Sequence, residues 1–170
     1  MSINGGLVDD SAPDRGHRRS PTPEQLRSWR TFVETAERMR STIGSRLQTD
    51  SGVSTGDYAI LLALSEAPNK RMRSSALAKH IDWERSRLSH HLARMEQRGL
   101  IEREDCATDS RGAEIVLTPE GANQFRRASA PHLRSVQQYF VDAFTPEQLL
   151  ALDEAMNALG EHLEARAAAI

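Results

Sequence analysis

Apolar residues recur at helical spacing along most of the chain. They fall three or four positions apart between residues 22 and 48, again between 54 and 67, and then over 119–143 and 145–166. This periodicity predicts four amphipathic helices. The first and the last open with matching tetrapeptides, Thr22-Pro23-Glu24-Gln25 and Thr145-Pro146-Glu147-Gln148, which suit a capping box with proline in the first turn. Pro131, inside the third pattern, predicts a kink.

Residues 73–118 combine shorter elements. A helix is expected over Ser74–His80, capped by Ser74 or Ser75, and a second helix ends near Gly99, with Asp82 able to cap its start. Two short segments, 100–104 and 114–117, alternate or run apolar with β-branched residues and flank a polar loop, which predicts a hairpin. This order of elements is that of a winged helix-turn-helix. The fold class is therefore mainly α with a small β wing.

The second helix of this unit has two different faces. Leu88, Leu92 and Met95 recur at i, i+4 and i+7 and should be buried. The opposite face consists of hydrogen-bond donors and small residues that fit base edges and phosphates. Its members are Arg85, Ser86, Arg87, Ser89, His90, Ala93 and Arg94. A solvated helix face is the ordinary alternative, but the position within a helix-turn-helix favours DNA contact.

The polar loop of the hairpin contains Asp109 and Arg111. Asp109 can hold Arg111 by a charge-assisted hydrogen bond, which would leave the guanidinium at the loop tip for a narrow minor groove. A pair that simply closes the turn is the alternative.

The run LSHHLARMEQRGLIERE, the Asp109/Arg111 pair and the run VLTPEG together resemble the MarR family of winged-helix transcriptional regulators, over residues 22–166. The resemblance implies a homodimer whose recognition helices enter successive major grooves of double-stranded DNA, with wing arginines in the flanking minor grooves. It assigns the wing role to Asp109 and Arg111. His91 stands where many members carry an apolar residue, so its orientation is left open. The positions assigned to the recognition helix are Ser86, Arg87, Ser89, His90 and Arg94.

The resemblance also implies a small-molecule effector, since many members release DNA when a small, often phenolic, anion binds between the dimer helices and the winged domain. Trp29, Arg30, Tyr58 and His132 could border such a crevice. The alternative is that Trp29 and Tyr58 are core residues and that His132 fills the kink after Pro131.

Charge and cysteine content narrow the choice of function. The net charge is −2, but residues 70–111 carry ten Lys or Arg against seven Asp or Glu, so this segment is +3 and the remainder −5. A basic patch on an acidic body favours oriented DNA binding.

A single cysteine, Cys106, excludes an internal disulfide, and its acidic neighbours argue against a reactive thiolate. No apolar run approaches the roughly 18 residues of a membrane span, and no signal peptide is evident, so a cytoplasmic protein is expected.

The chain divides into a disordered tail (1–21), an N-terminal dimerisation helix (22–52), a winged helix-turn-helix (53–118) and C-terminal dimerisation helices (119–170). No catalytic, metal or cofactor motif is present in the sequence. The expected function is that of a homodimeric repressor on a pseudo-palindromic operator. The alternative is a winged-helix module that binds proteins and has no specific DNA target.

Overall fold

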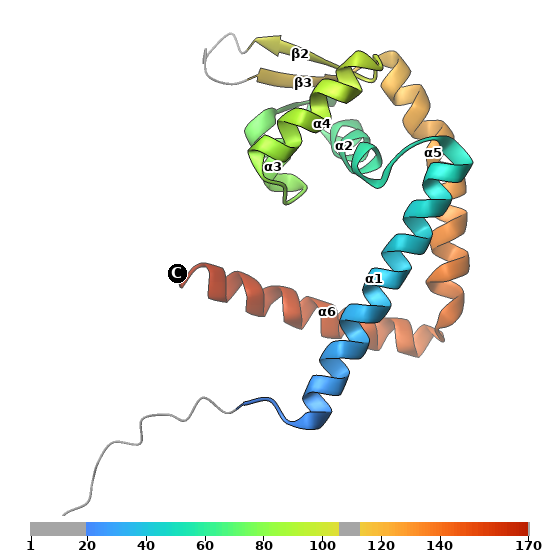
Figure 1. Ribbon diagram of the computed structural model, residues 1–170, viewed down its shortest axis with the longest axis vertical. Coiled ribbons are helices and arrows are strands. Elements are labelled where there is room, and N and C mark those ends of the chain that lie inside the picture. The colour runs from blue at the N-terminus through green and yellow to red at the C-terminus, as the bar shows by residue number, and fades with distance from the viewer. Residues whose placement is uncertain (1–19, 106–112, 170) are drawn as a thin grey trace, which may run out of the picture. The chain divides into compact units, whose positions relative to one another are not determined.

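The computed structural model describes residues 20–105 and 113–169, without the side chain of Asp105. Predictions that concern residues 1–19, Cys106, Asp109 and Arg111 lie outside this range. The chain forms two compact units, residues 1–36 and 37–170, and the first helix begins in one and ends in the other. The elements, shown in Figure 1, are α1 (Pro23–Ser51), α2 (Thr55–Glu66), η1 (Pro68–Lys70), β1 (Arg71–Arg73), α3 (Ser74–His80), α4 (Arg85–Gln97), β2 (Ile101–Asp105), β3 (Ala113–Leu117), α5 (Pro119–Tyr139), η2 (Val141–Ala143) and α6 (Pro146–Ala167).

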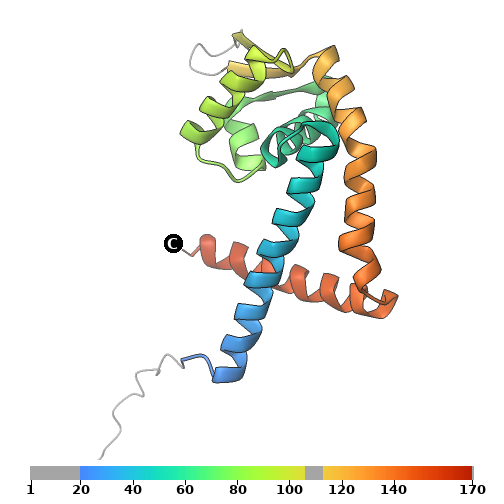
Figure 2. The same ribbon diagram turned by 45° about the vertical axis from the view of Figure 1, so that its right-hand side comes forward.

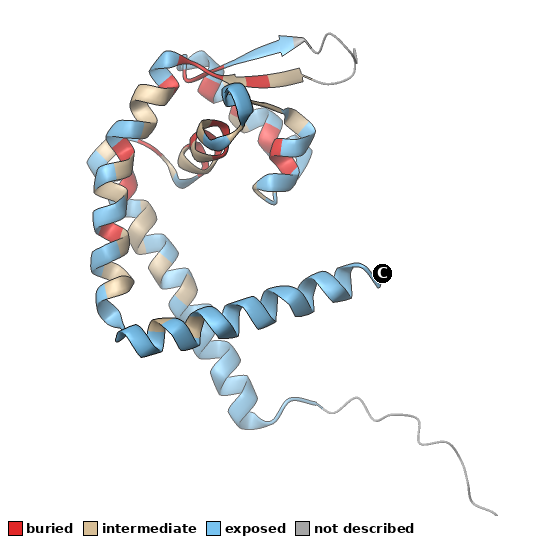
Figure 3. Cartoon of the chain, turned by 180° about the vertical axis from the view of Figure 1, so that it is seen from behind, coloured by how far each residue is buried: buried red, intermediate tan, exposed pale blue. Residues whose placement is uncertain are grey.

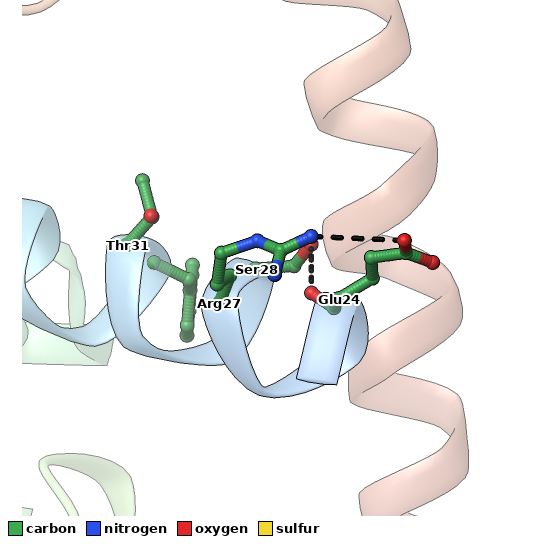
Figure 4. A pocket seen from close by; sticks show the side chains of 5 residues that line it. Glu24, Arg27, Ser28 and Thr31 are labelled. Atoms are coloured by element: carbon green, nitrogen blue, oxygen red, sulfur yellow. Dashed lines mark hydrogen bonds and ion pairs between the residues drawn. The ribbon is translucent and has the colours of Figure 1, made fainter. Parts of the chain in front are cut away.

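The described part of the first unit is the start of α1. Its predicted capping box is confirmed: the Thr22 N–H donates to Gln25 Oε1 at 2.9 Å, and the Gln25 N–H donates to Thr22 Oγ1 at 3.3 Å. Figure 4 shows an open depression along this turn, where Arg27 lies 3.7 Å from Glu24 and the Ser28 hydroxyl donates to the Glu24 carbonyl oxygen. These contacts are local to one helical turn.

The second unit contains a winged helix-turn-helix, which confirms the predicted fold class. Three antiparallel strands form a sheet in the order β1-β3-β2, with Met72 opposite Ile115 and Ile101 opposite Leu117. Figures 1 and 2 show α2, α3 and α4 gathered beside this sheet. Fully buried side chains from all of these helices and from β2 and β3 make up the core. The largest are Ile60, Leu61, Leu64, Leu77, Leu88, Leu92, Met95, Ile101 and Ile115.

Several local details differ from the sequence-based expectations. The strand β1 was not predicted, because three residues of sequence RMR are too short to show an alternating pattern. The helix α3 starts after Arg73, and neither Ser74 nor Ser75 caps it. Glu84, rather than Asp82, is the N-cap residue of α4, and it makes no side-chain cap bond. Asp82 instead adopts a left-handed backbone conformation, with φ of 53°, in the preceding turn.

The winged domain is joined closely to α5. Thr118 caps α5 by accepting from the Gly121 N–H at 2.9 Å, and its hydroxyl donates to the Gly99 carbonyl oxygen at 2.7 Å. Gly121 is needed there, because a Cβ atom would lie 2.0 Å from the Leu100 carbonyl oxygen. The helix runs through Pro131 and ends at Tyr139, earlier than predicted.

The last helix is different. The capping box between Thr145 and Gln148 is formed as predicted, yet none of the residues of α6, all of which are described, is buried. Its exposed large apolar side chains are Leu150, Met156, Leu159 and Leu163. Figure 3 shows the contrast between the buried interior of the winged domain and this exposed helix. Within residues 20–105 and 113–169, no helix is both long and apolar enough to cross a membrane.

Candidate nucleic-acid interface

The two faces of α4 are arranged as the sequence predicts. Leu88, Leu92 and Met95 are 0%, 1% and 0% exposed, which confirms the buried stripe. The opposite flank is exposed, and Figures 1 and 2 show α4 at the surface of the domain beside β2 and β3. Its exposed members are Arg85, Ser86, Arg87, Ser89, His90 and Arg94, whereas Ala93 is half-buried. Among the residues that the structure describes, none covers the cationic flank of the helix.

The Arg87 guanidinium lies over the indole of Trp83, with 4.1 Å between the guanidinium carbon and the ring centroid. A cation over an aromatic face is attracted by the ring quadrupole. The donors of a guanidinium point outward in its plane, so a guanidinium over a ring can still donate hydrogen bonds to another partner. Trp83 therefore supports Arg87 without blocking the hydrogen bonds that it could make to DNA.

His91 points inward, which settles the orientation that the sequence left open. Its side chain is 14% exposed, and Nε2 lies 2.8 Å from Asp57 Oδ1. On the other side of the ring, Nδ1 lies 3.1 Å from Arg94 Nη2. His91 therefore joins α2 to an arginine on the exposed flank of α4.

Asp57 is the buried end of this contact chain. The carboxylate is 5% exposed and also accepts from Arg98 Nη1 at 2.8 Å, through Oδ2. Burial raises the pKa of the Asp57 carboxyl, but hydrogen bonds from Arg98 and His91 outweigh this effect and hold the pKa below its ordinary value of 3.8. The carboxylate therefore stays charged and ties the first turn of α2 to α4.

The wing is tied to α4 by Arg103 on β2. Its Nη2 donates to the Ser89 carbonyl oxygen at 3.0 Å, and its Nε lies 3.3 Å from Glu96. Sequence reasoning missed Asp57, Trp83 and Arg103 as parts of this interface. Asp57 contacts residues 34 and 41 positions away, and Arg103 donates to a backbone atom, so no local pattern marks these two. The i,i+4 spacing of Trp83 and Arg87 is the one local signal that could have indicated their contact.

The four predicted effector residues fall into two groups. Tyr58 and His132 lie together in the second unit, with ring centroids 4.4 Å apart. The Phe125 ring lies against Tyr58 with 5.4 Å between centroids and its plane tilted by 42°. Trp29 and Arg30 belong to the first unit, and Trp29 is 63% exposed, so a core role for Trp29 within one chain is wrong. Burial lowers the pKa of His132, and its Nδ1 atom is buried with no hydrogen-bond partner among the described residues.

The fold and the exposed arginine flank define a winged helix-turn-helix protein. Residues 51–112 match the model of the MarR family. The structure is similar to that of AbsC, a MarR family transcriptional regulator from Streptomyces coelicolor, with 38% identity, a TM-score of 0.80, and coverage of 86% of this chain and 99% of AbsC. It is equally similar to Sco3205 from the same organism, a MarR family regulator in complex with DNA, with 39% identity, a TM-score of 0.80, and coverage of 85% and 91%.

A curated relative, the transcriptional regulator HosA of Escherichia coli, is 33% identical over 91 residues, which are 54% of this chain and 65% of HosA. The matched segment thus spans slightly less than two thirds of that protein. The chain belongs to the MarR family. Membership of this family places it among transcriptional regulators rather than enzymes.

Proposed function

We propose that the chain acts as a homodimeric repressor that binds a pseudo-palindromic operator in double-stranded DNA. The observation that carries this proposal is the division of α4, whose apolar stripe is buried while its arginine flank is exposed. Arg85, Arg87 and Arg94 present planar donors that suit guanine edges and phosphates in a major groove. Sco3205, which is 39% identical to this chain, was solved in complex with DNA, which supports DNA as the partner.

The proposed dimer is built from α1, α5 and α6. The apolar side chains of α6 support it, because Met156, Leu159 and Leu163 are exposed in the single chain. A two-fold arrangement would place the two recognition helices about one turn of DNA, ~34 Å, apart. In this arrangement Asp109 would hold Arg111 by a charge-assisted hydrogen bond, and the Arg111 guanidinium would enter a flanking minor groove. Sedimentation at micromolar concentration tests the dimer, and a monomer there would contradict it.

A small phenolic or anionic effector is proposed to bind beside Tyr58 and His132. The buried Nδ1 of His132, which lacks a partner among the described residues, offers a polar contact next to two aromatic rings. We expect the protein to act in the reducing cytoplasm, because its proposed partner is DNA and because its sequence contains a single cysteine. Titration calorimetry with salicylate as a probe tests the site, and heat that His132→Ala leaves unchanged would contradict it.

Fluorescence anisotropy on duplexes recovered by selection from random DNA tests the main proposal. Arg87→Ala should weaken operator binding by about 1–3 kcal/mol, the range expected for an arginine that contacts a base. Arg127→Ala is the matched control, since this arginine pairs with Glu120 on α5. Unchanged operator binding by the Arg87→Ala/Arg94→Ala variant would refute the assignment. Absence of salt-dependent binding to any duplex would favour the protein-interaction module instead.

A further inference from the structure

Two arginines on the exposed flank of α4 are supported by residues that lie behind them. We propose that the first turn of α2 acts through His91 and Trp83 to position Arg94 and Arg87 for DNA. In this proposal Asp57 and His91 are positioning residues that do not themselves contact the duplex. We call Asp57, His91 and Arg94 the positioning relay. The inference rests on the proposed function, because it assumes that Arg94 contacts DNA.

Asp57 is a fixed starting point for the relay. Both carboxylate oxygens are occupied: Oδ1 faces His91 Nε2 at 2.8 Å, while Oδ2 accepts from Arg98 and from the Ser54 N–H at 3.3 Å. The Ser54 hydroxyl accepts from the Asp57 N–H at 3.1 Å, which completes a capping box. The Asp57 carboxylate therefore has little freedom to rotate, and its contact with Nε2 fixes the orientation of the His91 ring.

The contacts of His91 define which ring nitrogen carries the proton. A carboxylate only accepts hydrogen bonds and a guanidinium only donates them. His91 satisfies both neighbours only as the neutral tautomer with hydrogen on Nε2, which donates to Asp57 and accepts from Arg94 at Nδ1. An apolar residue at position 91 could fill the same space but could not hold the guanidinium.

The second branch runs through Trp83, which packs edge-on against His91 with 5.2 Å between ring centroids. Its indole lies under Arg87. Gly56 allows both rings to sit against α2: a Cβ atom there would lie 2.7 Å from Trp83 Cη2 and 2.9 Å from His91 Cε1. The absence of a side chain at Gly56 thus brings the two supports against the start of α2.

Positioning matters because an arginine side chain loses rotamer freedom when it binds. A guanidinium already held in place loses less, so the same contact with DNA contributes more to affinity. If the relay served only to hold α2 against α4, a substitution of His91 would lower the stability of the fold. Its effect on DNA binding would then be the same with and without Arg94.

A double-mutant cycle on the full-length protein separates these cases. His91→Leu should weaken operator binding about three- to tenfold, as expected for loss of a hydrogen bond to a charged group at a partly exposed site. In an Arg94→Ala background the same change should have no further effect. His91→Gln should stay within about twofold of the parent, because its amide can donate to Asp57 and accept from Arg94.

Equal loss from His91→Leu with and without Arg94 would overturn the relay, as would His91→Gln binding as poorly as His91→Leu. An Arg94→Ala variant with full operator affinity would instead contradict the proposed DNA contact itself. NMR of the parent protein without DNA gives a result that needs no variant. The Arg94 guanidinium should be more ordered than that of Arg85, and equal mobility of the two would contradict the relay.

Discussion

The winged domain and α6 both have amphipathic sequences, but most large apolar side chains of the winged domain are buried and those of α6 are exposed or half-buried. Leu92 of α4 is 1% exposed within a core to which helices and strands all contribute, whereas Leu163 of α6 is 59% exposed. The winged domain covers its own apolar faces within one chain. The last helix does not, although its capping box and length make it equally regular. Amphipathic periodicity therefore shows that a face favours burial, but it does not show which molecule covers it.

The largest expected effect tests this difference directly. Leu92→Ala should lower the free energy of unfolding by about 2–5 kcal/mol, because it leaves a cavity in a closed core. The matched change Leu163→Ala should alter it by no more than about 0.5 kcal/mol at concentrations where the chain is monomeric. Urea unfolding measures both. Comparable losses in the two variants would mean that α6 is packed within its own chain.

A second pair of substitutions compares glycines in α5 and α6. Gly121→Ala should destabilise the protein by about 1–3 kcal/mol or more, since the added methyl group meets the Leu100 backbone at the junction with the wing. Thermal unfolding is the measurement. A melting temperature equal to that of the parent would show that the α5 junction can shift without cost.

Gly160→Ala is the counterpart in α6, where a Cβ atom would meet nothing within 4 Å. Alanine is favoured over glycine inside a helix, so this variant should be more stable by about 0.5–1 kcal/mol. Unfolding at several protein concentrations checks the sign. A loss of stability that grows with concentration would show that a second copy lies close to Gly160.

The sequence was sufficient to predict the features that depend on interactions between neighbouring residues. The capping boxes at Thr22 and Thr145, the bounds of α3 and the buried stripe of α4 depend on neighbours within one or two helical turns, and all were predicted. The predicted exposure of Arg87 and Arg94 followed from the same stripe.

Interactions between distant segments were not accessible in this way. His91 and Asp57 are 34 positions apart, so the pattern of α4 alone could not decide whether His91 turned inward. β1 became recognisable as a strand only through its pairing with β3. The capping role expected of Asp82 was wrong because its backbone turns into the left-handed region, and Glu84 takes the N-cap position instead. These features depend on how segments meet in three dimensions.

The smallest expected effect is a pH dependence of the free energy of unfolding caused by His132, which lies on α5 against Tyr58 of α2. Burial lowers the pKa of His132 from 6.5, so the folded chain disfavours the charged ring and the unfolded chain binds more protons. The contribution of His132 to the free energy of unfolding should therefore be fully present above about pH 6.5 and should be lost as the pH falls through the lowered pKa of the folded state.

His132→Gln should flatten this part of the pH profile of the free energy of unfolding, measured with urea at pH 7.5 and at lower values. Phe125→Leu, which weakens packing on Tyr58 but keeps the imidazole, should lower the whole curve and keep its slope. An unchanged slope in His132→Gln would assign the acid loss to another group.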